Sequence, residues 1–379
     1  MASHPPSLRS HGLLYLNILL CSFFCISVTH SMSDPFPAIF NFGDSLSDTG
    51  NLKRINVSSV LRLVNRFPYG ETSFNYPTGR FSDGRVIIDF VVEAFGYPYL
   101  PPYLACPDDT DFQSGVNFAV GGATAINTAF FTDRNISLFV NNSLFDQLQW
   151  FETLKPSLCD TEQDCNEYLS ESLFVLGEVG GNDYNLPLIQ GVSLEKVLQF
   201  VPKVIETISS AAKVLIGHGA KKMVVPNLIP LGCSALYLTL FSRPNETDFD
   251  PLNGCLKRYN DMVMYHNKLL KEAVKQLQME HPQVQFVYND WYGSSIRLYN
   301  SPRSFGFLNT FRACCGGKGP YNFNPNIWCS APGFNLCSDP SEYIDWDGIH
   351  LTEAAYHQIA NGVIYGSYSM PSLFSLIEV

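Results

Sequence analysis

Residues Ala38 to Asn51 read Ala-Ile-Phe-Asn-Phe-Gly-Asp-Ser-Leu-Ser-Asp-Thr-Gly-Asn, and this stretch decides the fold. Its short apolar run stops at Gly43, and small polar residues follow. The pattern predicts a buried strand ending in a tight turn, with Ser45 at the carboxyl end of the strand. Reactive groups gather at such ends in open parallel sheets, and a helix beginning just after Ser45 would direct its positive end toward the serine oxygen. A hairpin or helix-capping turn is the alternative interpretation of this stretch alone.

A second polar segment lies near the C-terminus, where Asp347 and His350 stand three positions apart before an apolar helical pattern. At that separation a carboxylate can hold the Nδ1 proton of the imidazole, which leaves Nε2 free to act as a base. The alternative is helix capping by Asp347 beside an incidental surface histidine. The other histidines His218, His266 and His281 have no carboxylate three positions earlier in a comparable turn, so His350 is the best base for Ser45.

Two glycine-rich turns follow predicted buried strands, one within the stretch Gly115–Ala123 and one, Gly180–Asp183, after Ser172–Gly177. Acyl transfer needs donors for a tetrahedral oxyanion. The backbone N–H of Gly122, with Gly121 as second choice, and the side-chain amide of Asn182 would join the N–H of Ser45 in that task. Neither turn has the spacing of a phosphate-binding loop.

The chain has 379 residues, of which 46% are hydrophobic, and a formal net charge of −11. This length accommodates one large α/β domain or two smaller ones. The acidic balance and the lack of a basic run exclude a dominant nucleic-acid-binding surface.

The N-terminal segment, residues 1–31, has the layout of a secretory signal peptide, with an apolar run from Leu13 to Val28 and cleavage near Ser31 to Asp34. A signal anchor is the competing interpretation. We expect no integral membrane segment after signal removal, since no later run is long and apolar enough. Residues 32–379 are expected to form a single domain.

Cysteines and glycosylation sequons agree with an oxidising destination. Nine cysteines follow the signal, an odd number that leaves one thiol over. Cys159 can close a small loop with Cys165, Cys233 can pair with Cys255, and the last four cysteines can form two bridges; zinc ligation is the less favoured use of that cluster. The candidate glycosylation sites are Asn56, Asn135, Asn141 and Asn245.

Apolar strand patterns alternate with helical ones along the chain, which predicts parallel strands with helices on both faces. Helices are expected over residues 85–95, 144–155, 193–216, 252–280 and 353–365, and further strands over 223–226 and 285–288. The loop from Phe67 to Gly84, rich in Pro, Gly and aromatic residues, is too long for a simple connector and is a candidate wall of a site.

Four blocks in order resemble those of the GDSL, or SGNH, hydrolase family: Phe42–Leu46, Gly115–Ala123, Gly180–Asp183 and Asp347–His350. The length, the signal and the cysteine-rich tail are similar to the plant secreted GDSL esterase/lipases. The resemblance implies a three-layer α/β/α sandwich, flavodoxin-like, with a parallel sheet of about five strands.

For the site, the resemblance implies Ser45 as nucleophile, Gly122 and Asn182 in the oxyanion hole, His350 as base and Asp347 as its orienting acid. No metal or organic cofactor is required. The expected function is hydrolysis of carboxylic esters through an acyl-enzyme on Ser45, acting on small or specialised-metabolite esters or on acyl lipids.

Two other functions stay open at this point: an acyltransferase that uses the same acyl-enzyme, and a secreted binding protein without activity. The aromatic loop from Phe67 to Phe81 suits either a lipase lid or a cradle for an aromatic ester. The sequence decides neither the oligomeric state nor delivery to the extracellular space or the vacuole.

Overall fold

The computed structural model describes residues 35–55, 57, 61–107, 110–242 and 248–377. The predicted signal peptide and the sequons at Asn56 and Asn245 lie outside the described residues. The sequons at Asn135 and Asn141 lie inside them, and both asparagines are exposed.

The centre of the fold is a six-stranded sheet with the order β2-β1-β3-β4-β5-β8. Its first five strands in the chain pair in parallel, as predicted, and β8 adds an antiparallel edge to β5. The strands are β1 (Ile39–Phe42), β2 (Gly115–Asn117), β3 (Leu173–Leu176), β4 (Lys222–Pro226), β5 (Gln285–Asn289) and β8 (Ser369–Met370). A separate small sheet pairs β6 (Cys315–Gly316) with β7 (Asn335–Leu336).

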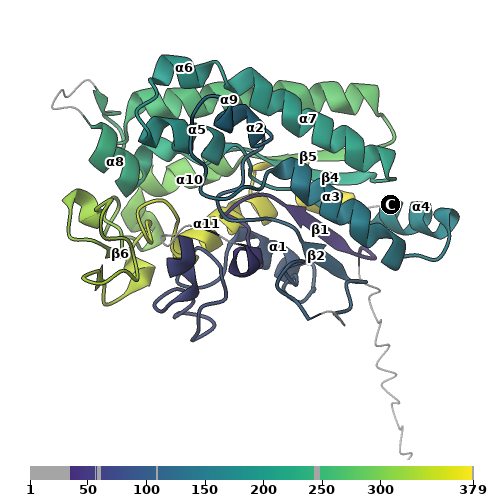
Figure 1. Ribbon diagram of the computed structural model, residues 1–379, viewed down its shortest axis with the longest axis horizontal. Helices are drawn as coiled ribbons and strands as arrows, with labels where there is room; N and C mark the ends of the chain where they lie inside the picture. The colour runs from purple at the N-terminus through teal and green to yellow at the C-terminus, as the bar shows by residue number, and fades with distance from the viewer. Residues whose placement is uncertain (1–34, 56, 58–60, 108–109, 243–247, 378–379) are drawn as a thin grey trace, which may run out of the picture. The chain divides into compact units, whose positions relative to one another are not determined.

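Helices cover both faces of the large sheet, which confirms the predicted α/β/α sandwich (Figure 1). They are α1 (Ile87–Ala94), α2 (Ala129–Thr132), α3 (Leu144–Leu154), α4 (Glu162–Glu171), α5 (Gly181–Ile189), α6 (Leu194–Leu198), α7 (Val201–Gly217), α8 (Ala235–Phe241), α9 (Lys257–Glu280), α10 (Trp291–Asn300) and α11 (Glu353–Ile364). Among the residues that the structure describes, none of these helices has the length and apolar character needed to cross a membrane.

The alternation of side chains along each strand divides the core into two layers. Phe40 and Phe42 of β1 point to the layer formed with α3, α5, α7 and α9, whereas Ile39 points to the layer formed with α1, α10 and α11. In the view of Figure 1, α7 and α9 lie on one side of the sheet, and α1 and α11 lie on the other. Burial on both faces explains why these strands read as continuous apolar runs.

The predicted helices differ substantially from the observed ones at two places. The predicted helix over 193–216 is divided into α6 and α7. Pro202 lacks an N–H, and its ring would clash with a preceding helical turn, so a new helix starts at Val201, one residue before the proline. The long helix α9 begins at Lys257 rather than at 252. Residues just before it are held in an irregular path by the Cys233–Cys255 disulfide and by Gly254, whose φ is +76°.

The structure contains the two pairs that the sequence suggested and shows how the last four cysteines, whose pairing the sequence left open, are joined. Four disulfides join Cys159 to Cys165, Cys233 to Cys255, Cys314 to Cys337 and Cys315 to Cys329, and Cys106 is the free cysteine of the described residues. The last two bridges tie together the segment that carries β6 and β7. This segment has little regular structure, so covalent links fix its path instead.

Candidate active site

Three strand ends at one edge of the sheet supply the residues of the site. Ser45 follows β1, Gly122 follows β2 and Asn182 follows β3, and these three strands are neighbours. All three residues line one pocket together with His350. The carboxyl ends of parallel strands meet at the same edge, which is why residues so distant in sequence come together.

The turn that carries Ser45 is tighter than the predicted helix. The N–H of Asp48 donates to the carbonyl of Asp44, which closes a single turn, and the chain then leaves the site. Gly43, with φ of +149°, allows the strand to bend sharply, and a Cβ there would lie 2.6 Å from Ser47 Oγ. No helix of the described chain therefore starts directly after Ser45, but the first turn of α5 contains Asn182, which lines the same pocket as Ser45.

Ser45, His350 and Asp347 form a continuous hydrogen-bonded chain. The distance from Ser45 Oγ to His350 Nε2 is 2.8 Å, and His350 Nδ1 lies 2.8 Å from Asp347 Oδ2. The backbone N–H groups of Ile349 and His350 donate to Asp347 Oδ1. Gly348, with φ of +105°, lets the segment turn back so that the carboxylate and the imidazole face each other.

The electrostatics fix the tautomer of His350. Burial acts to raise the pKa of Asp347, but the nearby imidazole and the hydrogen bonds outweigh it, so the pKa of this carboxyl lies below its usual value. An ionised Asp347 accepts hydrogen bonds only, and Nδ1 of His350 must therefore carry the proton. Nε2 then presents a lone pair to the hydroxyl of Ser45, as a general base requires.

The two glycines of the β2 turn have different roles. The N–H of Gly121 donates to Asp48 Oδ2 at 2.8 Å, and so it is already engaged. Gly122 adopts φ of +85°, and no hydrogen bond from its N–H to another described residue is present. Of the two glycines that the sequence suggested for the oxyanion hole, Gly122 is therefore the one whose N–H is available to a ligand.

The amide of Asn182 reaches the site but is already bonded. Its Nδ2 lies 3.1 Å from Asp44 Oδ2 and 3.0 Å from the carbonyl of Ala123. An oxyanion beside Ser45 must share one of these N–H groups or displace its present acceptor. The negative charge of an oxyanion favours this exchange over a neutral carbonyl acceptor.

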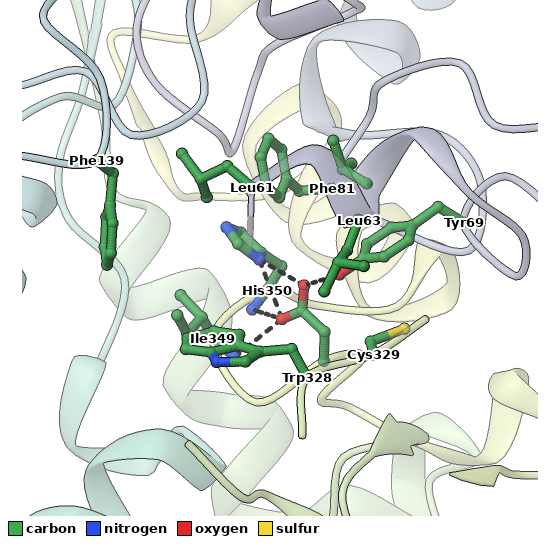
Figure 2. A pocket seen from close by; sticks show the side chains of 11 residues that line it. Leu61, Leu63, Tyr69, Phe81, Phe139, Trp328, Cys329, Ile349 and His350 are labelled. Atoms are coloured by element: carbon green, nitrogen blue, oxygen red, sulfur yellow. Dashed lines mark hydrogen bonds and ion pairs between the residues drawn. The ribbon is translucent and has the colours of Figure 1, made fainter. Parts of the chain in front are cut away.

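Apolar side chains enclose the space next to His350. Figure 2 shows Leu61, Phe81 and Phe139 around one side of the imidazole, with Ile349 and Trp328 on another. The ring of Phe81 lies 4.5 Å from the imidazole, centroid to centroid. Phe81 and Tyr69 come from the aromatic loop after Phe67, so this loop contributes to the wall of the pocket, as its composition suggested.

Sequence reasoning did not single out three residues of the site. Tyr69 donates to Asp347, Glu178 contacts Asp44, and Trp328 lines the pocket. An acidic residue directly after a buried strand was a usable signal for Glu178. Tyr69 and Trp328 lie in irregular loops, where no periodicity indicates which side chains point inward. No group of three or more His, Cys, Asp or Glu side chains suited to a metal ion occurs among the described residues.

A family model described as GDSL-like lipase/acylhydrolase matches residues 39–363. A GDSL esterase/lipase of Arabidopsis thaliana is 44% identical over 368 residues, which cover 96% of this chain and 93% of that protein. This chain belongs to the GDSL lipase/acylhydrolase family. A second GDSL esterase/lipase of the same plant is 47% identical over 345 residues, covering 89% of this chain and 92% of that protein.

A further relative, named sinapine esterase, comes from Brassica napus. It is 45% identical over 340 residues, which cover 89% of this chain and 87% of that protein. Together the family and these relatives identify the present GDSL protein as a carboxylic ester hydrolase.

Proposed function

We propose that the protein hydrolyses carboxylic esters through an acyl-enzyme on Ser45. His350 Nε2 takes the proton of Ser45 Oγ while the oxygen attacks the ester carbonyl carbon. The tetrahedral intermediate collapses, and His350 returns the proton to the departing alkoxide, which leaves as an alcohol. A water molecule then attacks the acyl-enzyme with His350 again as base, and the acid is released.

The developing oxyanion is stabilised by the N–H groups of Ser45 and Gly122 and by the amide of Asn182. Asp347 remains ionised throughout, holds the Nδ1 proton and stabilises the imidazolium that forms in each half-reaction. The observation that carries the proposal is the relay itself, with 2.8 Å on each side of the imidazole. None of these steps uses a metal or an organic cofactor.

Labelling with a fluorophosphonate, followed by peptide mapping, tests the nucleophile. We expect the adduct on Ser45 and loss of both labelling and ester hydrolysis in Ser45→Ala. Ser47→Ala is the matched control, because Ser47 is a buried serine in the same turn and lies outside the relay. Hydrolysis by a folded Ser45→Ala protein at the native rate would refute the assignment.

The substrate class that fits best is a small ester with an aromatic or short apolar part. The described residues that line the pocket beside His350 are apolar or aromatic apart from Asp347, His350 and the disulfide-bonded Cys329. A relative that shares 45% identity is named sinapine esterase. Rates on acetyl, aromatic and long-chain acyl esters test this preference, and fastest cleavage of the long-chain esters would favour acyl lipids instead.

The same acyl-enzyme permits transfer to an alcohol, and product analysis distinguishes the two reactions. With an added alcohol acceptor, a hydrolase releases mainly the free acid, whereas an acyltransferase forms the new ester. We propose hydrolysis as the main reaction.

We also propose that the protein is secreted after cleavage near Ser31 to Asp34. Four disulfides in the described residues support an oxidising compartment. N-terminal sequencing of the mature protein tests the cleavage site. Digestion with a glycosidase and peptide mapping test the sequons at Asn56, Asn135, Asn141 and Asn245, and localisation in cells separates extracellular from vacuolar delivery.

A further inference from the structure

A buried pair of carboxyl groups, Asp44 and Glu178, lines a pocket together with the proposed nucleophile. Asp44 precedes Ser45 directly, and Glu178 follows β3; their exposed fractions are 3% and 2%. The N–H of Asp44 donates to the backbone carbonyl of Glu178 at 3.2 Å, and each side chain shifts the pKa of the other, as carboxyl groups in contact do. Both residues line a pocket shared with Ser45, Asn182 and His350.

The contact between the two carboxyl groups requires a proton, because two carboxylates in contact cannot both be ionised in a buried site. Asp44 accepts hydrogen bonds from the N–H of Leu46 and from Asn182 Nδ2, each at 3.1 Å. Glu178 Oε2, in contrast, is buried and receives no hydrogen bond from the described residues. The donors around Asp44 favour the ionised form there, and the proton therefore belongs to Glu178.

The pKa values of the pair agree with this assignment. Burial raises the pKa of Glu178 well above its usual value, and the charge of Asp44 raises it further. Burial raises the pKa of Asp44 to about 6, against the opposing effect of its hydrogen bonds. Both directions agree with a proton on Glu178 beside a charged Asp44. The other titratable groups that face the pair from neighbouring segments are Asp48, Asp183, Tyr184, His350 and Tyr356.

Asp44 connects the two halves of the site. One of its oxygens caps the turn that carries Ser45, through the N–H of Leu46, and the other accepts from the amide of Asn182. Together with the carbonyl of Ala123, this carboxylate thus sets where the Asn182 amide lies relative to Ser45. Glu178 is a buried neighbour that interacts with that carboxylate.

We propose that Glu178 is a positioning residue, whose protonated carboxyl group donates to Asp44 and thereby holds the Asn182 amide in place beside Ser45. The inference rests on the proposed function and adds to it a group that never touches the ester. With this proton the pair carries one negative charge. Asp44 can then accept from Asn182 without electrostatic repulsion between its carboxylate and that of Glu178. A donor of the same size, such as an amide, can replace the protonated acid.

Two variants of similar volume distinguish the effect of losing the hydrogen-bond donor from the effect of losing side-chain volume. Glu178→Gln keeps an N–H donor toward Asp44, and Glu178→Met keeps the volume but has no donor. We expect Glu178→Gln to retain most of the native kcat. We expect Glu178→Met to lose up to about 100-fold in kcat, as misplaced reacting groups do, with KM little changed. Native kcat in Glu178→Met, or equal losses in both variants, would overturn the proposal.

Infrared difference spectra provide a second readout that a purely structural role does not alter. At neutral pH the native protein should show the carbonyl band of a protonated carboxylic acid that Glu178→Gln lacks. If the band is equally strong in both proteins, the proton is not on Glu178 and the proposal is wrong. This comparison needs only Glu178→Gln and is valid even if Glu178→Met does not fold.

The outcome is separable from the test of the proposed function. Ser45→Ala is assayed beside the Glu178 variants on the same ester. Activity that survives in Ser45→Ala refutes the acyl-enzyme on Ser45, whereas Ser45-dependent activity with native kcat in Glu178→Met refutes the role of Glu178 alone.

Discussion

The hydroxyl group of Tyr69 donates a hydrogen bond of 2.8 Å to Asp347 Oδ2, and 278 positions separate the two residues in the sequence. Burial and the adjacent carboxylate raise the pKa of Tyr69 well above its usual value, so the phenol stays protonated and donates. Asp347 thus receives bonds from the imidazole, from two backbone N–H groups and from Tyr69. The aromatic loop therefore fixes the carboxylate as well as lining the pocket.

We predict that Tyr69→Phe lowers kcat/KM by about 10- to 150-fold, since a hydrogen bond to a charged group is worth roughly 1.5–3 kcal/mol. The phenyl ring keeps its edge-on contact with Trp346, so the fold should survive. Steady-state kinetics on the best ester measure the loss. Tyr168→Phe is the control, because its hydroxyl bonds to the carbonyl of Gln113 outside the site. Equal kinetics of Tyr69→Phe and the native enzyme would show that the bond does not support the reaction.

We predict that Asn182→Ala reduces kcat by about 10²–10³-fold, the usual effect of removing one oxyanion donor, and leaves KM nearly unchanged. Its two present acceptors, Asp44 and Ala123, lose a donor as well, so folding is checked by thermal unfolding. Asn185→Ala is the comparison, because Asn185 lines the same pocket but accepts a hydrogen bond from Tyr237. We expect that variant to change KM more than kcat. Similar effects of the two substitutions would contradict a specific role for Asn182.

Much of the fold was predictable because its main signals are local. Buried parallel strands read as apolar runs, and the residue after each run indicates the functional edge of the sheet, as at Ser45 and Asn182. Strand β8 has only two residues, Ser369–Met370, and so carries no such signal. The break between α6 and α7 is caused by Pro202. The helical spacing of apolar residues continues across this break, so it did not predict two helices.

The sequence predicted which residues form the site better than it predicted the contacts between them. The spacing of Asp347 and His350 is local and indicates a pair, and the glycine turn indicates a donor at Gly122. The bond from Tyr69 to Asp347 joins a loop to the far end of the chain, and its geometry exists only after the sheet has formed. The proton that we place on Glu178 likewise depends on burial, which a single sequence does not reveal.

The stability of the protein should fall on acidification through His266. Burial lowers the pKa of His266 to about 3, and an unfolded imidazole titrates near about 6.5. Between these values the unfolded chain binds more protons, so the free energy of unfolding decreases as the pH falls, by up to about 1.4 kcal/mol per pH unit. In His266→Gln we therefore expect a smaller change in this free energy between about pH 7 and about pH 4.5.

Chemical denaturation at the two pH values measures this difference, and the comparison with native protein cancels the contribution of the carboxyl groups. Gln can still bond to the hydroxyl of Tyr184, which lies 2.7 Å from His266 Nδ1. The exposed His357 supplies the control, His357→Gln, which should keep the native pH dependence. A pH dependence in His266→Gln as steep as the native one would exclude His266 as its source.

The Cys315–Cys329 disulfide should matter for the site more than Cys159–Cys165 does. Cys329 lines the pocket beside Trp328 and closes a loop with a sequence separation of 14, against 6 for the other bridge. Loops of about this length correspond to roughly 3 kcal/mol of stabilisation. We predict that Cys315→Ser with Cys329→Ser lowers the melting temperature and raises KM, whereas Cys159→Ser with Cys165→Ser leaves KM unchanged. Equal KM values in the two double variants would mean that the covalent link does not hold the pocket wall.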